Sequence, residues 1–303
     1  MKIFYALALI STPFFASAKP LDLKKVSADS NWIMHMNFDS VRNSEIGIFM
    51  EDAFENMPEV QRKVLKVQEK YGIHPMKISS FTMFGTGEKH KGIGILEGGI
   101  NAEIVSGFAQ SKDSIEGSKV GENTIFSSQK GRRPMAFTAL ENGRMIFGPD
   151  RDYVSDGIFF ANGLGKGMEL HPIHESLTGL LVDPGFLFFA NVKNVMEVVE
   201  FNEWGRSMAD KIDSCGMVIG DQNGELKLVA LLKTTSIEVS EPIENMVRGG
   251  LAMMEMKAGE DSNTEQILNS YQVTREGKII RVEVGISNSF LIDRIKKEIK
   301  KSV

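Results

Sequence analysis

The sequence has a single cysteine, Cys215, so no disulfide can form within one chain. The fold must be held together by its apolar core. A chain of 303 residues is long enough for one, because it buries roughly three quarters of its unfolded surface. Cys215 lies in the run 214–219, whose small and apolar residues predict a strand. We therefore interpret this cysteine as a small packing residue rather than as a nucleophile.

The chain also lacks a long stretch of one charge sign and, beyond its first residues, long apolar runs. Its 35 basic and 40 acidic residues give a formal net charge of −5, and the basic residues form no stripe, which argues against a nucleic-acid partner. The most apolar later run is 185–190, which has the length of a strand. It is far shorter than the ~20 residues of a transmembrane helix, so we expect no membrane span in the mature protein.

The first eighteen residues have the features of a signal peptide. Lys2 precedes the apolar run 3–10, Pro13 interrupts any helix, and the A-x-A motif 16–18 is typical of a cleavage site. A membrane anchor is the alternative, but the uncharged stretch 3–18 is too short for one. We expect export with cleavage after Ala18, to a periplasm or to the outside of the cell.

Apolar periodicity along the mature chain alternates between strand and helix patterns. Alternating or continuous short runs predict strands, and apolar residues three or four positions apart predict helices. The predicted strands are 31–38, 78–84, 92–96, 124–128, 135–140, 144–147, 185–191, 215–219, 226–232, 266–274 and 279–284. The predicted helices are 46–57, 58–71, 102–108, 154–161, 195–210, 242–254 and 291–299.

The order of these elements suggests an internal duplication. The segment 77–85 resembles 211–220 with one residue of slip, and a similar order of strands and helices surrounds both. The offset is far longer than the ~20–50 residues of solenoid repeats, which favours domain duplication. We expect an α+β fold of two related halves, 19–165 and 166–303, joined by the glycine-rich stretch 162–167. Each half is expected to be a mainly antiparallel sheet with helices packed on one face.

A further pattern supports this fold. The residues Gly72-Ile73-His74-Pro75 precede the apolar strand 78–85, and Gly94-Ile95-Leu96-Glu97-Gly98 precedes a helix. With the opening strand 32–39, this resembles a pattern in uncharacterised exported bacterial proteins, in which the first motif reads roughly G-I-D-P. His74 stands here in place of the acidic residue. The resemblance implies an α+β fold and no known activity.

Histidines and nearby acids are the candidates for chemistry. His171 and His174 lie three residues apart in an expected loop, and His35 and Asp39 bracket the end of the first strand. Zinc sites use three or four such ligands, so these four are the metal-ligand or acid–base candidates of an envelope hydrolase. No other catalytic residue and no cofactor is predicted. The alternative is that these four residues are loop and strand-edge residues without a chemical role.

Two further groups are candidates for partner binding. Lys130, Arg132 and Arg133 form a basic hairpin tip that suits an acidic partner or an anionic envelope polymer, although such tips are usually only solvated. Met253 and Met256 extend the methionines of the helix 242–254 beyond one face, which suits an adaptable contact surface, with ordinary core packing as the alternative.

Three functions follow from these observations. The first is a non-enzymatic exported protein that binds an envelope protein or itself. The second is a small-ligand carrier with a cleft between the halves. The third is an envelope hydrolase whose site lies at the domain interface.

Overall fold

The computed structural model describes residues 20–128, 134–169, 171–195, 209–258 and 271–302. Within these ranges, only the backbone is described for residues 194–195, 254–258 and 300–302.

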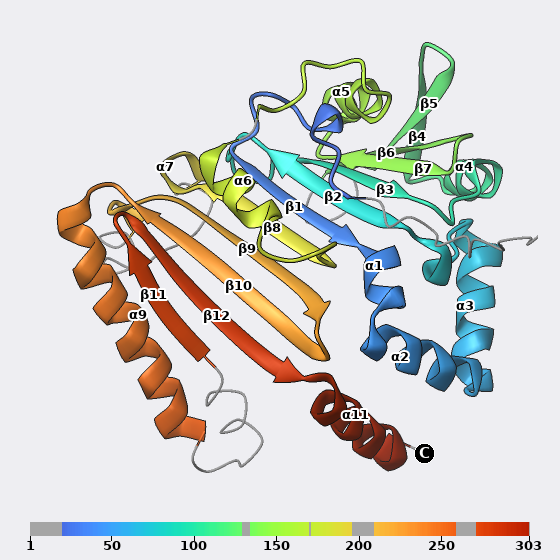
Figure 1. Ribbon diagram of the computed structural model, residues 1–303. Coiled ribbons are helices and arrows are strands. Elements are labelled where there is room, and N and C mark those ends of the chain that lie inside the picture. Colours follow the sequence, from blue (N-terminus) through green and yellow to red (C-terminus); the bar gives the residue numbers. More distant parts are fainter. Residues whose placement is uncertain (1–19, 129–133, 170, 196–208, 259–270, 303) are drawn as a thin grey trace, which may run out of the picture.

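Twelve strands form one antiparallel sheet in the order β11-β12-β10-β9-β8-β1-β2-β3-β7-β6-β5-β4 (Figure 1). The strands are β1 (Trp32–Asn37), β2 (Ser80–Gly85), β3 (Ile93–Glu97), β4 (Ile115–Val120), β5 (Asn123–Ser128), β6 (Met135–Leu140), β7 (Arg144–Gly148), β8 (Phe186–Asn191), β9 (Ile212–Gln222), β10 (Glu225–Thr234), β11 (Tyr271–Glu276) and β12 (Ile279–Ser287). The antiparallel α+β class is confirmed. The two expected halves share this sheet, because β1 pairs with β8 at its centre.

Neighbouring strands follow a similar order outward from the β1–β8 pair. On one side the order is β1-β2-β3-β7-β6, and on the other it is β8-β9-β10-β12-β11. The hairpin β4–β5 has no described counterpart in the second half. The similar segments 77–85 and 211–220 contribute β2 and β9, which occupy corresponding positions. The duplication and the domain boundary at residue 165 remain predictions from the sequence.

The helices begin and end at residues with clear physical roles. The Asn37 side chain accepts a hydrogen bond from Ser40 N, and Asp150 caps α5 as its sequence predicts. Gly72 ends α3 with φ of 70°, a conformation that glycine adopts without strain. The described helices are η1 (Leu23–Lys25), α1 (Phe38–Asn43), α2 (Glu45–Glu55), α3 (Pro58–Tyr71), η2 (Pro75–Lys77), α4 (Ala102–Gln110), α5 (Arg151–Ala161), α6 (Pro172–Thr178), α7 (Val192–Val195), α9 (Ile237–Ala258) and α11 (Asn288–Ser302).

One face of the sheet, which contains Ile33 and Phe189 and is called the covered face, carries α5 and α6. Helix α5 packs on Ile93, Ile95 and Ile146 of the first half. Helix α6 packs on Leu187 and other apolar residues of the second half. Leu21 and Met168 contact both clusters, so the N-terminal segment joins the two parts of this core.

On the opposite face, which contains Met34 and Phe188 and is called the open face, the helices of the described residues pack near the two edges of the sheet. Helix α4 covers Phe126 and Phe137 at the β4–β6 end. Helix α9 covers Val273 and Ile280 at the other end. Helices therefore pack on both faces, where the sequence pattern led us to expect one. The reason is that strands β5 and β6 carry apolar residues on both sides of the pleat, and β12 carries most of its apolar residues on the open face, where α9 packs.

Four local expectations differ from the structure. Strand β4 was not predicted, because its residues are mostly polar and it lies at the edge of the sheet. The expected loop at His171 is helix α6, with His171 as N-cap and Pro172 in the first turn. Helix α9 begins at Ile237 and contains Pro242.

The fourth difference concerns the expected linker 162–167. Gly167 forms a β-bridge with Ser27, and Ala28 N donates to the Lys166 carbonyl at 3.1 Å. These bonds tie the stretch to the N-terminal segment, so it is not a free connection between two bodies.

Candidate functional site

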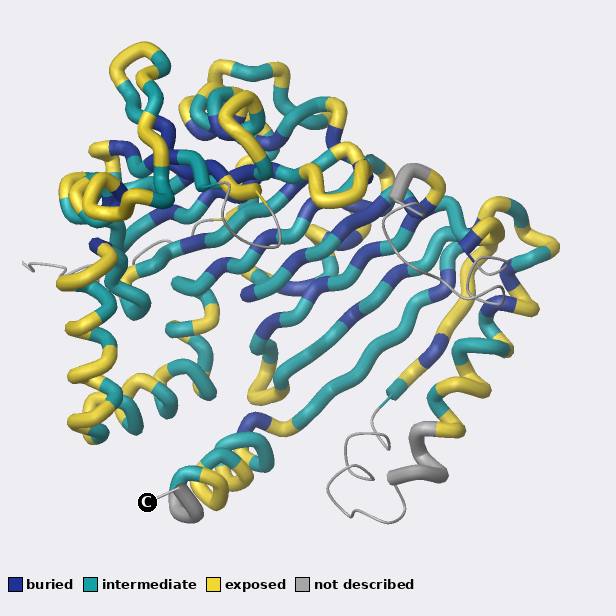
Figure 2. Tube along the Cα trace, turned by 180° about the vertical axis from the view of Figure 1, so that it is seen from behind, coloured by how far each residue is buried: buried dark blue, intermediate teal, exposed yellow. Residues whose placement is uncertain are grey.

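The central part of the open face is an apolar floor without a charged side chain. Figure 2 shows the central strands between α4 and α9 without a described helix across them, while α2, α3 and α11 lie toward one end. The floor is formed by half-buried residues of β1, β2, β3, β8, β9 and β10: Trp32, Met34, Met36, Phe81, Met83, Leu96, Phe186, Phe188, Met217, Ile219, Leu228 and Ala230.

Strand register places these side chains in continuous rows. Met34 of β1 is opposite Met83 of β2 on one side and Phe188 of β8 on the other, and Phe188 is opposite Met217 of β9. None of the twelve floor residues belongs to a buried cluster of the described residues. The floor is therefore apolar surface that the described chain leaves only partly covered. Such surfaces commonly mark interaction sites.

The helices around the floor are amphipathic, and their apolar sides are not fully covered. Neither α2 nor α3 has a buried residue. Ile48 of α2 is 60% exposed, and Leu65 of α3 is 52% exposed. Helix α3 packs on α4, and α2 packs on α11. Together with α4, these helices form the margin of the floor. Their charges are mixed, because α2 is acidic whereas α3 and α11 carry several basic residues.

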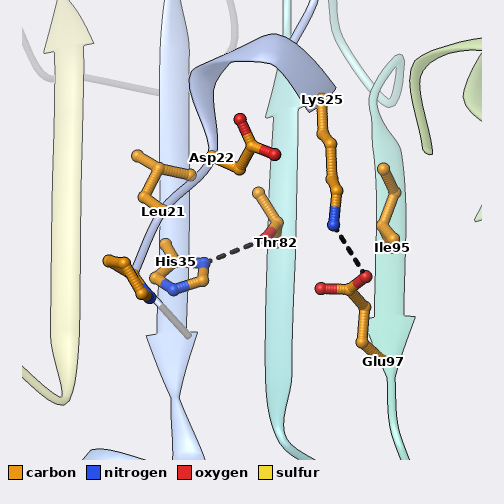
Figure 3. Close-up of a pocket in the computed structure, with 8 residues that line it drawn as sticks. Leu21, Asp22, Lys25, His35, Thr82, Ile95 and Glu97 are labelled. Atoms are coloured by element: carbon orange, nitrogen blue, oxygen red, sulfur yellow. Dashed lines mark hydrogen bonds and ion pairs between the residues drawn. The ribbon is translucent and has the colours of Figure 1, made fainter. Parts of the chain in front are cut away.

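The covered face has a different feature, a pair of adjacent cavities beneath the N-terminal segment. One has a volume of about 490 Å³ and the other about 370 Å³, and Pro20, Leu21 and His35 line both. Figure 3 shows His35, Thr82 and Glu97 pointing into the first cavity. His35 Nδ1 lies 2.9 Å from Thr82 Oγ1, and His35 is 5% exposed.

Glu97 organises the polar side of the larger cavity. Its Oε1 accepts from Lys25 Nζ at 3.0 Å and from Arg144 Nε at 2.8 Å, and its Oε2 accepts from Ser80 Oγ at 3.2 Å. Arg144 also donates to the Ala161 carbonyl at 2.8 Å. This cluster joins η1, β3, β7 and the end of α5. The Glu97 carboxylate is paired with both cations, so we interpret this cluster as a structural ion-pair network, called the Glu97 network.

Only two of the four predicted chemical candidates line one cavity. His35 and His174 line the same 370 Å³ cavity, together with Asp183. His171 caps α6, and burial lowers its pKa. Asp39 lies in the first turn of α1 and forms an ion pair with Arg42. The described residues contain no cluster of three or more histidine, cysteine or acidic side chains that could hold a metal ion.

The predicted partner-binding residues are only partly described. Lys130, Arg132 and Arg133 lie outside the described residues, and so does the side chain of Met256. Met253 is on α9 and is 63% exposed. The floor residues were not singled out by the sequence. Their signal was the alternation of methionine and aromatic residues in the runs 32–36 and 186–188, which predicts strands but does not say which face stays open.

No helix among the described residues combines the length and apolar character needed to cross a membrane. The chain matches no protein-family model and none of the curated proteins with which it was compared.

Solved structures do resemble it. Crystal form III of TP0453 matches with a TM-score of 0.52 and 10% identity over 93% of this chain and 99% of that one. Crystal form IV gives 0.52 and 11% over 92% and 97%. Crystal form I gives 0.50 and 12% over 94% and 99%. At these identities the likeness shows the fold alone.

Proposed function

We propose that this is an exported, non-enzymatic binding protein whose apolar floor receives a helical segment of another protein. The observation that carries the proposal is the uncharged, half-buried floor between α4 and α9, with methionine and aromatic side chains in register. Interface cores are depleted in charge and enriched in aromatic residues and methionine. The unbranched methionines allow such a surface to adapt to its partner.

The geometry favours a helix over a strand as the occupant. The floor lies in the middle of a continuous sheet, so its strands have no free edge for another strand to join. From β10 to β3 there are five strand spacings, or roughly 24 Å. One helix with its side chains is about 10–12 Å wide, so one helix or two side by side fit between α4 and α9. A second sheet wider than this gap would collide with α4 and α9, which pack on the same face.

The charges at the margin favour a protein over a membrane surface. Glu51, Asp52 and Glu55 of α2 are acidic, whereas Lys63 and Lys66 of α3 are basic. A mixed polar rim around an apolar centre is typical of protein interfaces. An anionic membrane surface would be attracted by a margin that is basic throughout.

Export belongs to the same proposal and rests on the first eighteen residues of the sequence. N-terminal sequencing of the protein recovered outside the cytoplasm tests it. We expect the mature chain to begin at Lys19. Recovery of the intact N-terminus inside the cell would contradict export. It would leave the proposed binding site unaffected.

Binding is tested with a fluorescent amphipathic helical peptide of leucine, alanine, lysine and glutamate, about eighteen residues long. The control peptide has the same composition in an order that puts no apolar face on a helix. We expect the amphipathic peptide alone to bind, with Met34→Glu weakening its affinity at least about tenfold. Val182→Glu is the matched control, because Val182 is 79% exposed and lies outside the floor.

Three results would overturn the floor as a helix site. They are equal binding of both peptides, binding unchanged by Met34→Glu, and failure of the amphipathic peptide to bind. Circular dichroism of each variant verifies that it is folded. Sedimentation of the protein alone tests the second copy as the occupant; a dimer lost in Met34→Glu would replace the partner helix by self-association.

A further inference from the structure

The smaller cavity on the covered face is lined by a buried polar side chain that has no hydrogen-bond partner among the described residues. His174 of α6 is 3% exposed. Neither its Nδ1 nor its Nε2 has a hydrogen-bond partner among the described residues. Buried polar atoms are nearly always paired, and an unpaired one calls for a water or a ligand. The ring is held in place, because it packs edge-on against Phe189 at a centroid distance of 6.4 Å.

The remaining lining is mostly apolar. Leu21, Leu23, Leu181, Pro184 and Leu187 supply most of the cavity wall. The volume of about 370 Å³ lies in the range of small-molecule pockets, and such pockets are largely apolar with a few polar groups that fix orientation. The cavity lies where the two parts of the sheet meet, since His35 belongs to β1 and Leu187 to β8.

The polar groups define the chemistry of the occupant. A neutral imidazole has one donor and one acceptor nitrogen, and a hydroxyl group can satisfy either or both. Burial lowers the pKa of His174, which favours the neutral ring. Asp183 is the charged side chain among the described lining residues, and its negative charge opposes an anionic ligand. Lys25 is paired with Glu97 at the neighbouring cavity and offers no free cation for a carboxylate.

We propose that this cavity is a second binding site, for a small, uncharged and mostly apolar molecule that carries a hydroxyl group. The apolar walls bind its body, and His174 binds the hydroxyl. The site lies on the face opposite the apolar floor, so it is independent of the proposed helix-binding function.

Three naphthalene probes of similar size test the proposal by equilibrium dialysis: 2-naphthol, 2-methylnaphthalene and 2-naphthoate. We expect one molecule of 2-naphthol to bind per chain, at least about tenfold tighter than either of the others. Equal binding of 2-methylnaphthalene would reduce the site to an apolar void. Tighter binding of 2-naphthoate would make it an anion site. Absence of binding by all three probes would overturn the proposal.

Variants assign the hydroxyl contact to His174. His174→Leu should abolish the preference for 2-naphthol over 2-methylnaphthalene. His174→Gln should keep part of it, because the amide retains a donor and an acceptor. His90→Ala is the matched control, since His90 is an exposed loop residue. A preference that survives in His174→Leu would exclude His174 from the site. The three-probe comparison on the unaltered protein decides the proposal even if that variant fails to fold.

Discussion

The two faces of this sheet are built from the same strands, but helices cover their central parts to different extents. Ile33 and Phe189 are opposite each other on the covered face, and both are fully buried. Met34 and Phe188, their immediate neighbours in sequence, are opposite each other on the open face and remain half-buried. The comparison teaches that an apolar strand pattern alone does not define a core. The helices that pack on it decide whether an apolar face stabilises the fold or stays available for binding.

The largest expected effect is a difference in stability loss between alanine substitutions of two adjacent phenylalanines, one on each face. Phe189→Ala removes a ring that is 0% exposed and should lower the free energy of unfolding by about 4 kcal/mol. Phe188→Ala removes a half-buried ring and should cost about 1–2 kcal/mol, because less apolar area returns to water. Urea denaturation measures both. Equal losses would mean that the open face is as well packed as the covered face.

The second largest effect on the free energy of unfolding should come from the Glu97 network on the covered face. Glu97→Gln removes the charge that pairs with Lys25 and Arg144 and should cost about 3 kcal/mol, because two cations lose their buried partner. The control is Glu88→Gln, which breaks an exposed ion pair with Lys91 and should leave stability nearly unchanged, because solvent screens such a pair. Similar effects of the two substitutions would show that the ion pairs of Glu97 do not stabilise the fold.

Cys215 reports on the open face itself. Burial raises the pKa of its thiol to about 11, so the reactive thiolate is scarce at pH 8. Iodoacetamide should therefore alkylate Cys215 about 200-fold more slowly than a free cysteine with a pKa near 8.5, as measured by mass spectrometry. The rate should rise as the pH approaches 11. Alkylation at the rate of free cysteine at pH 8 would place this thiol in open solvent.

The smallest effect is a dependence of stability on pH through His174. Burial lowers its pKa in the folded state below the ordinary value of 6.5. Below pH 6.5 the unfolded chain therefore binds a proton that the folded chain does not, and stability falls as the pH falls. The fall ends once the pH is below the folded pKa. His171 contributes in the same direction, because its pKa is also lowered.

Urea denaturation at pH 7.5 and pH 5.5 measures this dependence. His174→Leu should reduce the loss of stability between the two pH values, and His90→Ala should leave the loss unchanged. If His174→Leu loses as much stability as the unaltered protein, His174 titrates normally in the folded chain.

Local patterns predicted most of the sheet. Strand β6 was expected at 135–140, where it lies, because its apolar run ends at the Asn-Gly turn. Strand β4 was missed since Glu116, Gly117 and Lys119 give it little apolar signal. Helix α6 was missed because a seven-residue helix shows hardly two turns of periodicity. Its proline at the first position, with Ile173 and Leu177 four residues apart, was the available signal.

The candidate sites were less predictable, for a physical reason. His35 and His174 were recognised as candidates, but their shared cavity depends on where the segment Pro20–Leu21 packs. The floor depends on the positions of α4 and α9, which are tertiary contacts. Alternation in β1 marks Met34 as facing away from Ile33, and only packing determines which of the two faces a helix covers.

Crosslinking from the floor in the producing cell tests the central claim most directly. A photoreactive phenylalanine analogue replaces Met34 in the middle of the floor, and the same analogue at Val182 is the control. We predict a light-dependent adduct to a different protein at position 34, through a helical peptide of that protein, and no such adduct at position 182. No adduct at position 34, or adducts only to lipid or to a second copy of this chain, would contradict the account.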